Sequence, residues 1–118
     1  MRILVVDDEN RISNLLKIYL EREDFQVTTE EDGLTGLERA INEHFDLVVL
    51  DVLMPGKNGF QVLEELRKAK DTPAILLSAQ YTEKDQKRGL ALGANAFIAK
   101  PFSPKTIVSK IKELLLGE

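Results

Sequence analysis

Five short apolar runs divide the chain at nearly regular intervals. They are rich in leucine and β-branched residues, which favour strands in runs of this length. Two of the runs contain LVVL and ILLS, which have no polar interruption, as expected of parallel strands buried on both faces of a sheet. The pattern predicts five strands, namely ILVV (3–6), FQVTT (25–29), DLVVL (46–50), AILLS (74–78) and AFIA (96–99).

Segments with helical spacing lie between and after these runs. Apolar residues recur at intervals of three and four over residues 12–20 and 107–115, and more weakly over 34–41 and 60–66. The last of these helices has a clear beginning and end. Ser103-Pro104 is typical of an N-cap followed by a first helical residue, and Gly117 lies just past the end.

The segment between AILLS and AFIA is the weakest candidate helix. Thr82 to Asp85 matches a variant of the capping box, and Gly93 can end the helix. Its apolar residues are only Leu90, Ala91 and Leu92, beside a glycine. We therefore expect this helix to be held loosely.

Strands that alternate with helices predict a parallel sheet covered on both faces. A length of 118 residues fits one domain, so residues 1–118 are expected to form a single doubly wound (βα)5 unit. The flavodoxin-like strand order 2-1-3-4-5 fits five such units. The fold class expected is therefore α/β, with a five-stranded parallel sheet in this order.

Composition narrows the function. There is no cysteine, which excludes disulfides and thiolate metal sites. The net charge of −4 is uneven, because residues 1–59 carry 6 basic and 13 acidic side chains whereas residues 60–118 carry 10 basic and 7 acidic ones. This argues against a nucleic-acid binder, which would show a dense basic stripe. It suits a cation site together with a second surface that meets a protein.

The beginning of the chain bears on location. Met1 runs directly into the strand-like RILVV, with no basic leader and no apolar run approaching 18 residues. We expect a cytoplasmic protein that does not associate with a membrane.

Polar residues gather at the ends of the predicted strands. In open α/β sheets, ligands bind beyond the carboxyl ends of the strands where the strand order reverses, here between strands 1 and 3. Strand 1 ends in Asp7-Asp8-Glu9 and strand 3 ends in Asp51. Strands 4 and 5 end in Ser78 and just before Lys100-Pro101, respectively.

Three carboxylates in one crevice require compensation. Two like charges about 4 Å apart repel by roughly 4 kcal/mol at an effective dielectric near 20, and Asp7, Asp8 and Asp51 make three such pairs. Lys100 offsets one charge. The negative charge that remains indicates a bound divalent cation. Hard oxygen ligands without histidine or cysteine select Mg²⁺ (or Mn²⁺). A carboxylate, a hydroxyl and an ammonium beside such an ion favour phosphoryl transfer through an aspartyl phosphate.

Four motifs carry a family resemblance: VVDDE (5–9), D-x-x-M-P-x-x-x-G (51–59), LLSA (76–79) and GANAFIAKPF (93–102). In this order and at these strand ends, they resemble the receiver domains (CheY-like) of response regulators in two-component phosphorelay systems. The resemblance covers essentially the whole chain. It implies that Asp51 is phosphorylated by a histidine kinase or a histidine phosphotransfer protein.

The resemblance also implies a role for each matching residue. Asp8, Asp51 and the Leu53 backbone carbonyl would bind Mg²⁺ directly, and Asp7 mostly through water. Ser78 would hydrogen-bond the phosphoryl group and Lys100 would pair with it, while the Lys100-Pro101 peptide bond would be cis. Phe97 matches an aromatic switch position. A phenylalanine there cannot donate a hydrogen bond, so its signal would be steric.

Two further positions tune hydrolysis in this family, namely Leu53 and Gln80. An apolar Leu53 cannot orient a water, so slow self-dephosphorylation is expected, although the polar Gln80 can counteract it. Such a domain promotes its own phosphorylation but is not a turnover enzyme on external substrates. Ser78 is expected to move toward the phosphoryl group and vacate space that Phe97 then fills. The change would shift the fourth helix, fifth strand and fifth helix between two arrangements.

Two other classes of function share this fold or this chemistry. A Mg²⁺-dependent aspartate phosphatase for small phosphate esters usually carries D-x-D, whereas Asp7 and Asp8 are adjacent and there is no cap domain. A flavin carrier on the same fold would need hydroxyls and amides in its phosphate-binding loop, whereas the acidic segment DDEN (7–10) would repel a phosphate.

The output stays open: a downstream protein target or a fused output domain, with the receiver acting as a monomer or a phosphorylation-dependent homodimer. Asn95-Ala96 weakens the dimer interface, since related transcription factors often have acids there.

Plainer explanations exist for single residues. Asp7 and Asp8 can cap the following helix, Ser78 can be turn chemistry, and Phe97 can be core. The only histidine, His44, has no partner for a metal or phosphate role. Lys84, Lys87 and Arg88 are most simply a solvated helix face, with an interaction surface as the alternative.

Overall fold

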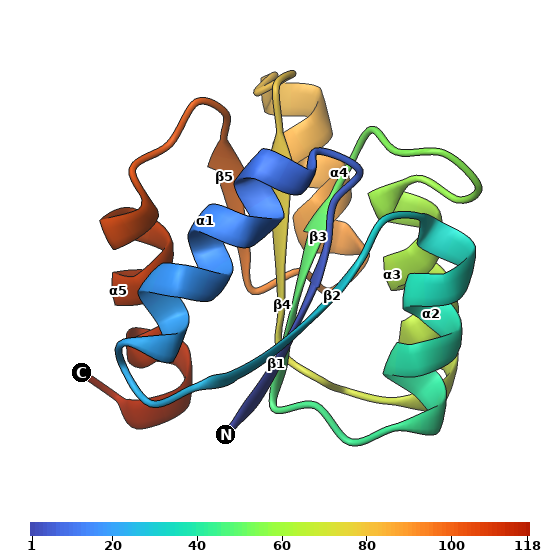
Figure 1. Ribbon diagram of the computed structural model, residues 1–118. Coiled ribbons are helices and arrows are strands. Elements are labelled where there is room, and N and C mark those ends of the chain that lie inside the picture. The colour runs from blue at the N-terminus through green and yellow to red at the C-terminus, as the bar shows by residue number, and fades with distance from the viewer.

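The computed structural model describes residues 1–118 as alternating strands and helices. The sheet lies in the middle, with α1 and α5 on one side and α2 and α3 on the other (Figure 1). The elements are β1 (Arg2–Val6), α1 (Asn10–Glu21), β2 (Gln26–Glu30), α2 (Gly33–Asn42), β3 (Leu47–Asp51), α3 (Gly59–Ala69), β4 (Ala74–Ser78), α4 (Glu83–Ala91), β5 (Ala96–Ala99) and α5 (Pro104–Leu116).

All strand pairs are parallel, and their order is β2-β1-β3-β4-β5. The expected fold class and strand order are therefore confirmed. β1 and β3 pair with Val6 opposite Leu50, and β3 and β4 pair with Asp51 opposite Leu77. This register brings the carboxyl ends of β1, β3 and β4 side by side at one edge of the sheet.

The first three strands differ from the sequence expectation by one residue. β1 begins at Arg2 rather than Ile3, β2 covers 26–30 rather than 25–29, and β3 covers 47–51 rather than 46–50. The turn before β2 contains Asp24 in the left-handed region with φ of 67°, so pairing with β1 begins only at Gln26. Asp51 is thus the last residue of a fully buried strand, which agrees with the prediction that the third strand ends in Asp51.

The sheet separates two hydrophobic clusters. One face packs on α1 and α5 through side chains such as Leu16, Leu20, Ile107 and Ile111. The other packs on α2 and α3 and includes Phe97 of β5. Burial on both faces explains why β3 and β4 are apolar along nearly their whole length, because neither face of these strands meets water.

The fourth helix has the thin buried face that the sequence predicts, but the buried residue is not one of the expected apolar ones. Its only buried residue is Gly89, and the Leu90 side chain is 58% exposed instead of contributing to a buried stripe. Leu92, just past the helix, packs partly against the core. The Thr82 side chain caps the helix by accepting a hydrogen bond from the Asp85 N–H.

Ion pairs and hydrogen bonds connect residues at the opposite edge of the sheet, where the strands begin. Glu43 pairs with Arg2 and Arg39, which holds the pKa of the Glu43 carboxyl down at about 2 through hydrogen bonds from Arg39 and then Arg2. Lys70, at the end of α3, donates to the carbonyls of Ala40 and Glu43 at 3.0 and 2.8 Å. These bonds join the ends of α2 and α3.

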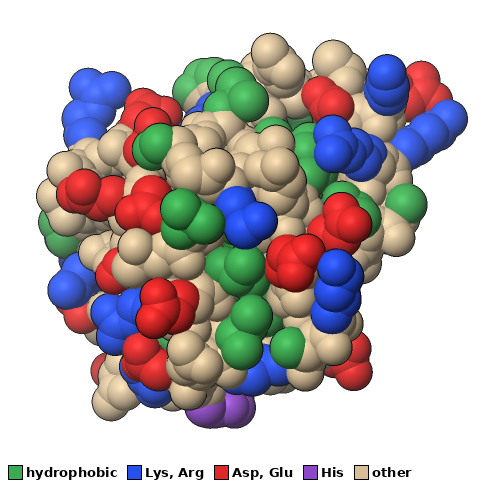
Figure 2. Space-filling model, turned by 90° about the vertical axis from the view of Figure 1, so that its right-hand side faces the viewer, with side chains coloured by type: hydrophobic (Ala, Val, Ile, Leu, Met, Phe, Trp, Pro, Cys, Tyr) green, Lys and Arg blue, Asp and Glu red, His purple; other side chains and the backbone are tan.

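The face formed by the α2–α3 side carries acidic and basic side chains interspersed with apolar ones (Figure 2). Exposed apolar residues elsewhere include Leu15 and Ile18 of α1. No helix combines the length and apolar character needed to cross a membrane.

Candidate functional site

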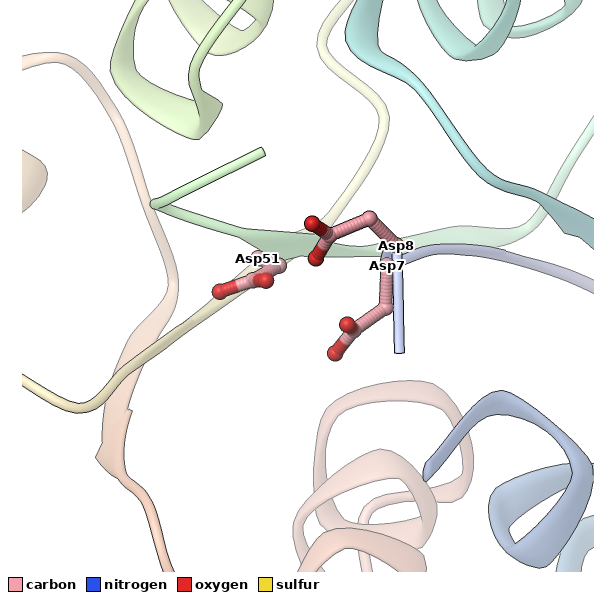
Figure 3. Close-up of side chains that lie close together, drawn as sticks. All are labelled: Asp7, Asp8 and Asp51. Atoms are coloured by element: carbon pink, nitrogen blue, oxygen red, sulfur yellow. The ribbon is translucent and has the colours of Figure 1, made fainter. Parts of the chain in front are cut away.

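Three aspartates meet at the ends of β1 and β3. A carboxylate oxygen from each of Asp7, Asp8 and Asp51 lies within 4.8 Å of the others, around a common space (Figure 3). Asp7 and Asp51 are buried, whereas Asp8 is exposed. The parallel register produces this cluster, because the end of β1 lies directly beside the end of β3.

Local turns orient the two buried carboxylates. Asp7 Oδ1 accepts a hydrogen bond from the Glu9 N–H at 2.9 Å, and Asp51 Oδ1 accepts one from the Leu53 N–H at 3.4 Å. Both are short-range bonds from the backbone two residues ahead, as expected for aspartate at the start of a turn. Each of the two carboxylates therefore keeps one oxygen directed away from its own backbone.

Lys100 is the cation of the site. It follows β5, and its backbone N–H bonds to the Ser78 carbonyl at 2.8 Å. Its Nζ lies 3.0 Å from Asp7 Oδ2, 3.0 Å from Glu9 Oε1 and 3.3 Å from Asp51 Oδ2. Burial alone would lower the pKa of this ammonium, but the Asp7, Glu9 and Asp51 carboxylates outweigh burial and raise it.

One lysine does not neutralise the two buried carboxylates or supply all their hydrogen bonds. Asp7 Oδ2 is fully buried and accepts no hydrogen bond, although the Lys100 ammonium is in ion-pair range at 3.0 Å. Burial, and then the charge of Asp7, raise the pKa of the Asp51 carboxyl to about 7 despite Lys100 and the Leu53 N–H. The cluster is therefore short of positive charge. Three carboxylates with an orphaned oxygen among them fit a hard divalent cation.

Ser78 ends β4 beside this cluster. The side chain is fully buried, and its Oγ accepts a hydrogen bond from the Gln80 N–H at 3.0 Å. Because that bond uses a lone pair, the hydroxyl hydrogen remains available for an acceptor. Gln80 thus contributes a backbone bond that orients Ser78, while its own side chain is exposed.

Leu53 lies at the mouth of the site with its side chain 51% exposed. The Lys100-Pro101 peptide bond is cis. Leu53 lies two residues past Asp51, the candidate phosphoacceptor. The cis bond follows β5, as the sequence predicts.

Phe97 is buried, with 9% exposure, and belongs to an aromatic stack. Its ring centroid lies 6.3 Å from that of Phe60 and 5.6 Å from that of Tyr81. The Arg88 guanidinium lies 4.3 Å from the Phe60 centroid, so Arg88 has a partner that a plain solvated face would not give it. Since Phe97 is already packed inward, a switch at this position would rearrange the stack rather than bring a ring in from solvent.

Glu9 is the site contact that the sequence did not assign. It was visible at the end of strand 1, but its partner Lys100 is 91 residues away and no spacing rule joins them. The other expected positions lie as follows. Lys84 and Lys87 are exposed on α4, and Asn95 Oδ1 accepts the Ala74 N–H at 2.9 Å, which ties β5 to the start of β4. His44 is exposed: its ring lies 3.3 Å from Asp46 Oδ1, and its carbonyl accepts a hydrogen bond from Arg2.

The fold and the aspartate cluster are those of a known family of protein domains. The family model for the response regulator receiver domain, a domain of two-component systems, matches residues 3–112, and the chain belongs to that family. Among curated relatives, it is 41% identical over 114 residues to the transcriptional regulatory protein ResD of Bacillus subtilis, covering 97% of this chain and 48% of that protein. It is 42% identical over 113 residues to the transcriptional regulatory protein SrrA of Staphylococcus aureus, covering 96% and 47%.

Among solved structures, the chain is similar to the response regulator protein TrrA of Thermotoga maritima in complex with Mg(2+)-BeF. The TM-score is 0.87 and the identity 38%, covering 97% of this chain and 98% of that one. The chain spans about half the length of the curated relatives that it matches.

Proposed function

We propose that this chain is a phosphoacceptor receiver domain in which Asp51 takes a phosphoryl group from a histidine kinase or a histidine phosphotransfer protein. An Asp51 carboxylate oxygen attacks the phosphorus, the P–N bond of the donor histidine breaks, and that nitrogen leaves with the electron pair. The observation that carries the proposal is the shared Lys100 ammonium beside two buried carboxylates, one of which has a buried oxygen that accepts no hydrogen bond.

Asp7, Asp8, Asp51 and the Leu53 carbonyl are the groups proposed to hold Mg²⁺ or Mn²⁺, with Asp7 acting mostly through water. When bound, such an ion supplies positive charge that neutralises the transferring group and lowers the cost of an ionised Asp51. The Ser78 hydroxyl donates to a phosphoryl oxygen, and Lys100 pairs with another. Their burial excludes water from that side of the group, which strengthens both interactions.

The signal is proposed to leave through α4 and β5. Phosphorylation adds charge and acceptor oxygens beside Ser78, whose strand pairs with β5, and Phe97 of β5 touches α4 at Gly89. Ser78 moves toward the phosphoryl group, and the Phe97 stack repacks. We place the protein in the cytoplasm. We also propose a downstream protein target or fused output domain, with the receiver as a monomer or phosphorylation-dependent dimer and without turnover of external substrates.

The decisive experiment is labelling by acetyl phosphate, read by intact mass. We expect one phosphoryl adduct on the wild type in the presence of Mg²⁺ and none after chelation. Asp51→Asn should give no adduct, and Asp46→Asn, a matched aspartate outside the site, should label like the wild type. Labelling of Asp51→Asn at the wild-type rate would show that the phosphoacceptor is another residue.

A further inference from the structure

The Lys100 ammonium has three carboxylates around it, one of which, Glu9, has no role in the proposed phosphoacceptor site. The Lys100 ammonium donates a hydrogen bond to Glu9 Oε1 at 3.0 Å, whereas Asp7 and Asp51 lie within ion-pair range at 3.0 and 3.3 Å. The Lys100 side chain is only 10% exposed. A phosphoryl group that takes the N–H now bonded to Glu9 must therefore displace the Glu9 carboxylate.

The three carboxylates differ in how easily they can be displaced. Asp7 and Asp51 are buried, and moving the ammonium away from either one would leave an uncompensated charge. Glu9 has a side chain 52% exposed, so water can replace Lys100 as its partner at little cost. Glu9 is the contact that can be exchanged.

The position of Glu9 in the chain supports a specific role. It is the N-cap residue of α1, where the shorter side chains of Ser, Thr, Asp and Asn ordinarily bond to the free N–H groups of the first turn. The Glu9 side chain makes no such bond, although its backbone carbonyl accepts from Ile12 and Ser13. It reaches instead to Lys100, so the geometry is that of a tether on the lysine rather than of a helix cap.

We propose that Glu9 is a positioning residue that acts through Lys100. It occupies the outer donor of the ammonium before phosphorylation and competes there with the incoming phosphoryl group, which holds back phosphorylation. This inference rests on the proposed receiver function and adds a residue to it. No covalent step involves Glu9, because only the partner of one N–H donor changes.

Three variants test the competition, with acetyl phosphate as donor at saturating Mg²⁺. Glu9→Gln removes the charge at nearly constant size, and we expect Asp51 to be phosphorylated about three- to fivefold faster, the upper end of what an exposed ion pair contributes. Glu9→Asp keeps the charge but is one methylene too short to hold Lys100 in place, so it should also be faster. Glu31→Gln removes an exposed acid that does not contact Lys100 and should stay within about twofold of the wild type.

A second readout follows Lys100 directly in the metal-free protein. Loss of the Glu9 contact should speed exchange of the Lys100 ammonium protons with water several-fold in ¹⁵N NMR, in Glu9→Gln and Glu9→Asp but not in Glu31→Gln. Unchanged exchange in both Glu9 variants would overturn the proposal, since the tether would then be absent. Slower phosphorylation of Glu9→Gln would overturn the competition, and a wild-type rate for Glu9→Asp would indicate a through-space charge effect instead.

The outcomes separate this inference from the function beneath it. If the wild type is not labelled at all, the receiver function fails. If the wild type is labelled through Asp51 and both Glu9 variants label at its rate, the receiver function stands and the role of Glu9 is refuted.

Discussion

Gly89 of α4 lies against the ring of Phe97 with no room for a side chain. A Cβ at this position would come within 2.9 Å of Phe97 Cδ2 and within 2.9 Å of Leu76 Cδ1. Glycine thus lets α4 approach β4 and β5 at the only buried position of the helix. This contact, together with that of Arg88 over the Phe60 ring, joins α4 to the aromatic stack.

Gly89→Ala should destabilise the protein. Alanine favours an α-helix over glycine by roughly 1 kcal/mol, but overpacking a core costs about 1–3 kcal/mol. We expect a net loss of about 1 kcal/mol in the free energy of unfolding by urea denaturation, together with altered NMR shifts at Phe97 and Tyr81. Lys84→Ala on the exposed face of the same helix is the control and should change little. Greater stability of Gly89→Ala would mean that α4 moves away freely.

The buried charge of Asp51 should make stability depend on pH. The pKa of its carboxyl is raised from 3.8 to about 7 in the folded protein, mainly by burial and then by Asp7. The folded state therefore binds more protons than the unfolded state between these values, and stability falls as pH rises from about 4 to 7. Without divalent metal, Asp51→Asn should be more stable than the wild type at pH 8, by on the order of 2–4 kcal/mol.

That difference should shrink toward pH 4, where the wild-type carboxyl is protonated in the folded state and carries only part of its charge in the unfolded state. Urea denaturation at pH 4.5, 6 and 8 in EDTA measures it. Saturating Mg²⁺ should stabilise the wild type at pH 8 and narrow the gap. An advantage of Asp51→Asn that is constant with pH would contradict a titrating Asp51.

Leu53→Asn should shorten the lifetime of the acyl phosphate. Leu53 lies two residues past Asp51 with its side chain half exposed, and an amide there can hold a water that leucine cannot. One added hydrogen bond of about 1 kcal/mol corresponds to roughly fivefold faster hydrolysis. Decay of the phosphorylated mass after donor removal measures the rate. Leu34→Asn, at an equally exposed leucine on α2, should leave the rate unchanged.

Gln80→Ala should act in the opposite direction and lengthen the lifetime. The Gln80 side chain is exposed beside Ser78, and alanine removes the amide but keeps the N–H that bonds Ser78 Oγ. The same mass decay reads the effect, which should be on the order of a few-fold. Equal lifetimes for Gln80→Ala and the wild type would remove Gln80 from the hydrolysis step.

Lys70→Met should lower stability without affecting phosphorylation. The Lys70 ammonium bonds two carbonyls at the end of α2, and methionine keeps the bulk but leaves both acceptors unpaired. We expect a loss of about 1–3 kcal/mol in the free energy of unfolding. Lys68→Met, which loses only an exposed pair with Glu65, should cost far less. An equal loss in both variants would indicate a general charge effect.

The sequence was sufficient for the strand order and for the meeting of Asp7, Asp8 and Asp51, because apolar periodicity and parallel topology together determine which strand ends adjoin. It was insufficient where side chains choose among partners. The Glu9–Lys100 contact joins residues with no spacing relation, and the exposure of Leu90 depends on how α4 rotates over Gly89. The stack of Arg88, Phe60, Phe97 and Tyr81 likewise arises only from packing.

The register of the sheet has a mechanical consequence. Asp7, Asp51 and Ser78 extend from or just beyond three adjacent strands joined by backbone hydrogen bonds, so no hinge lies between them. Their relative positions are preorganised, and little rearrangement energy is spent when charge arrives among them. The freedom to respond is left to two parts outside this edge of the sheet: the Lys100 ammonium, which can exchange one of its three carboxylate partners, and the α4 helix, which buries only Gly89. The charge of a phosphoryl group would thus arrive at a rigid position, and the structural response would occur in the Lys100 side chain and in α4.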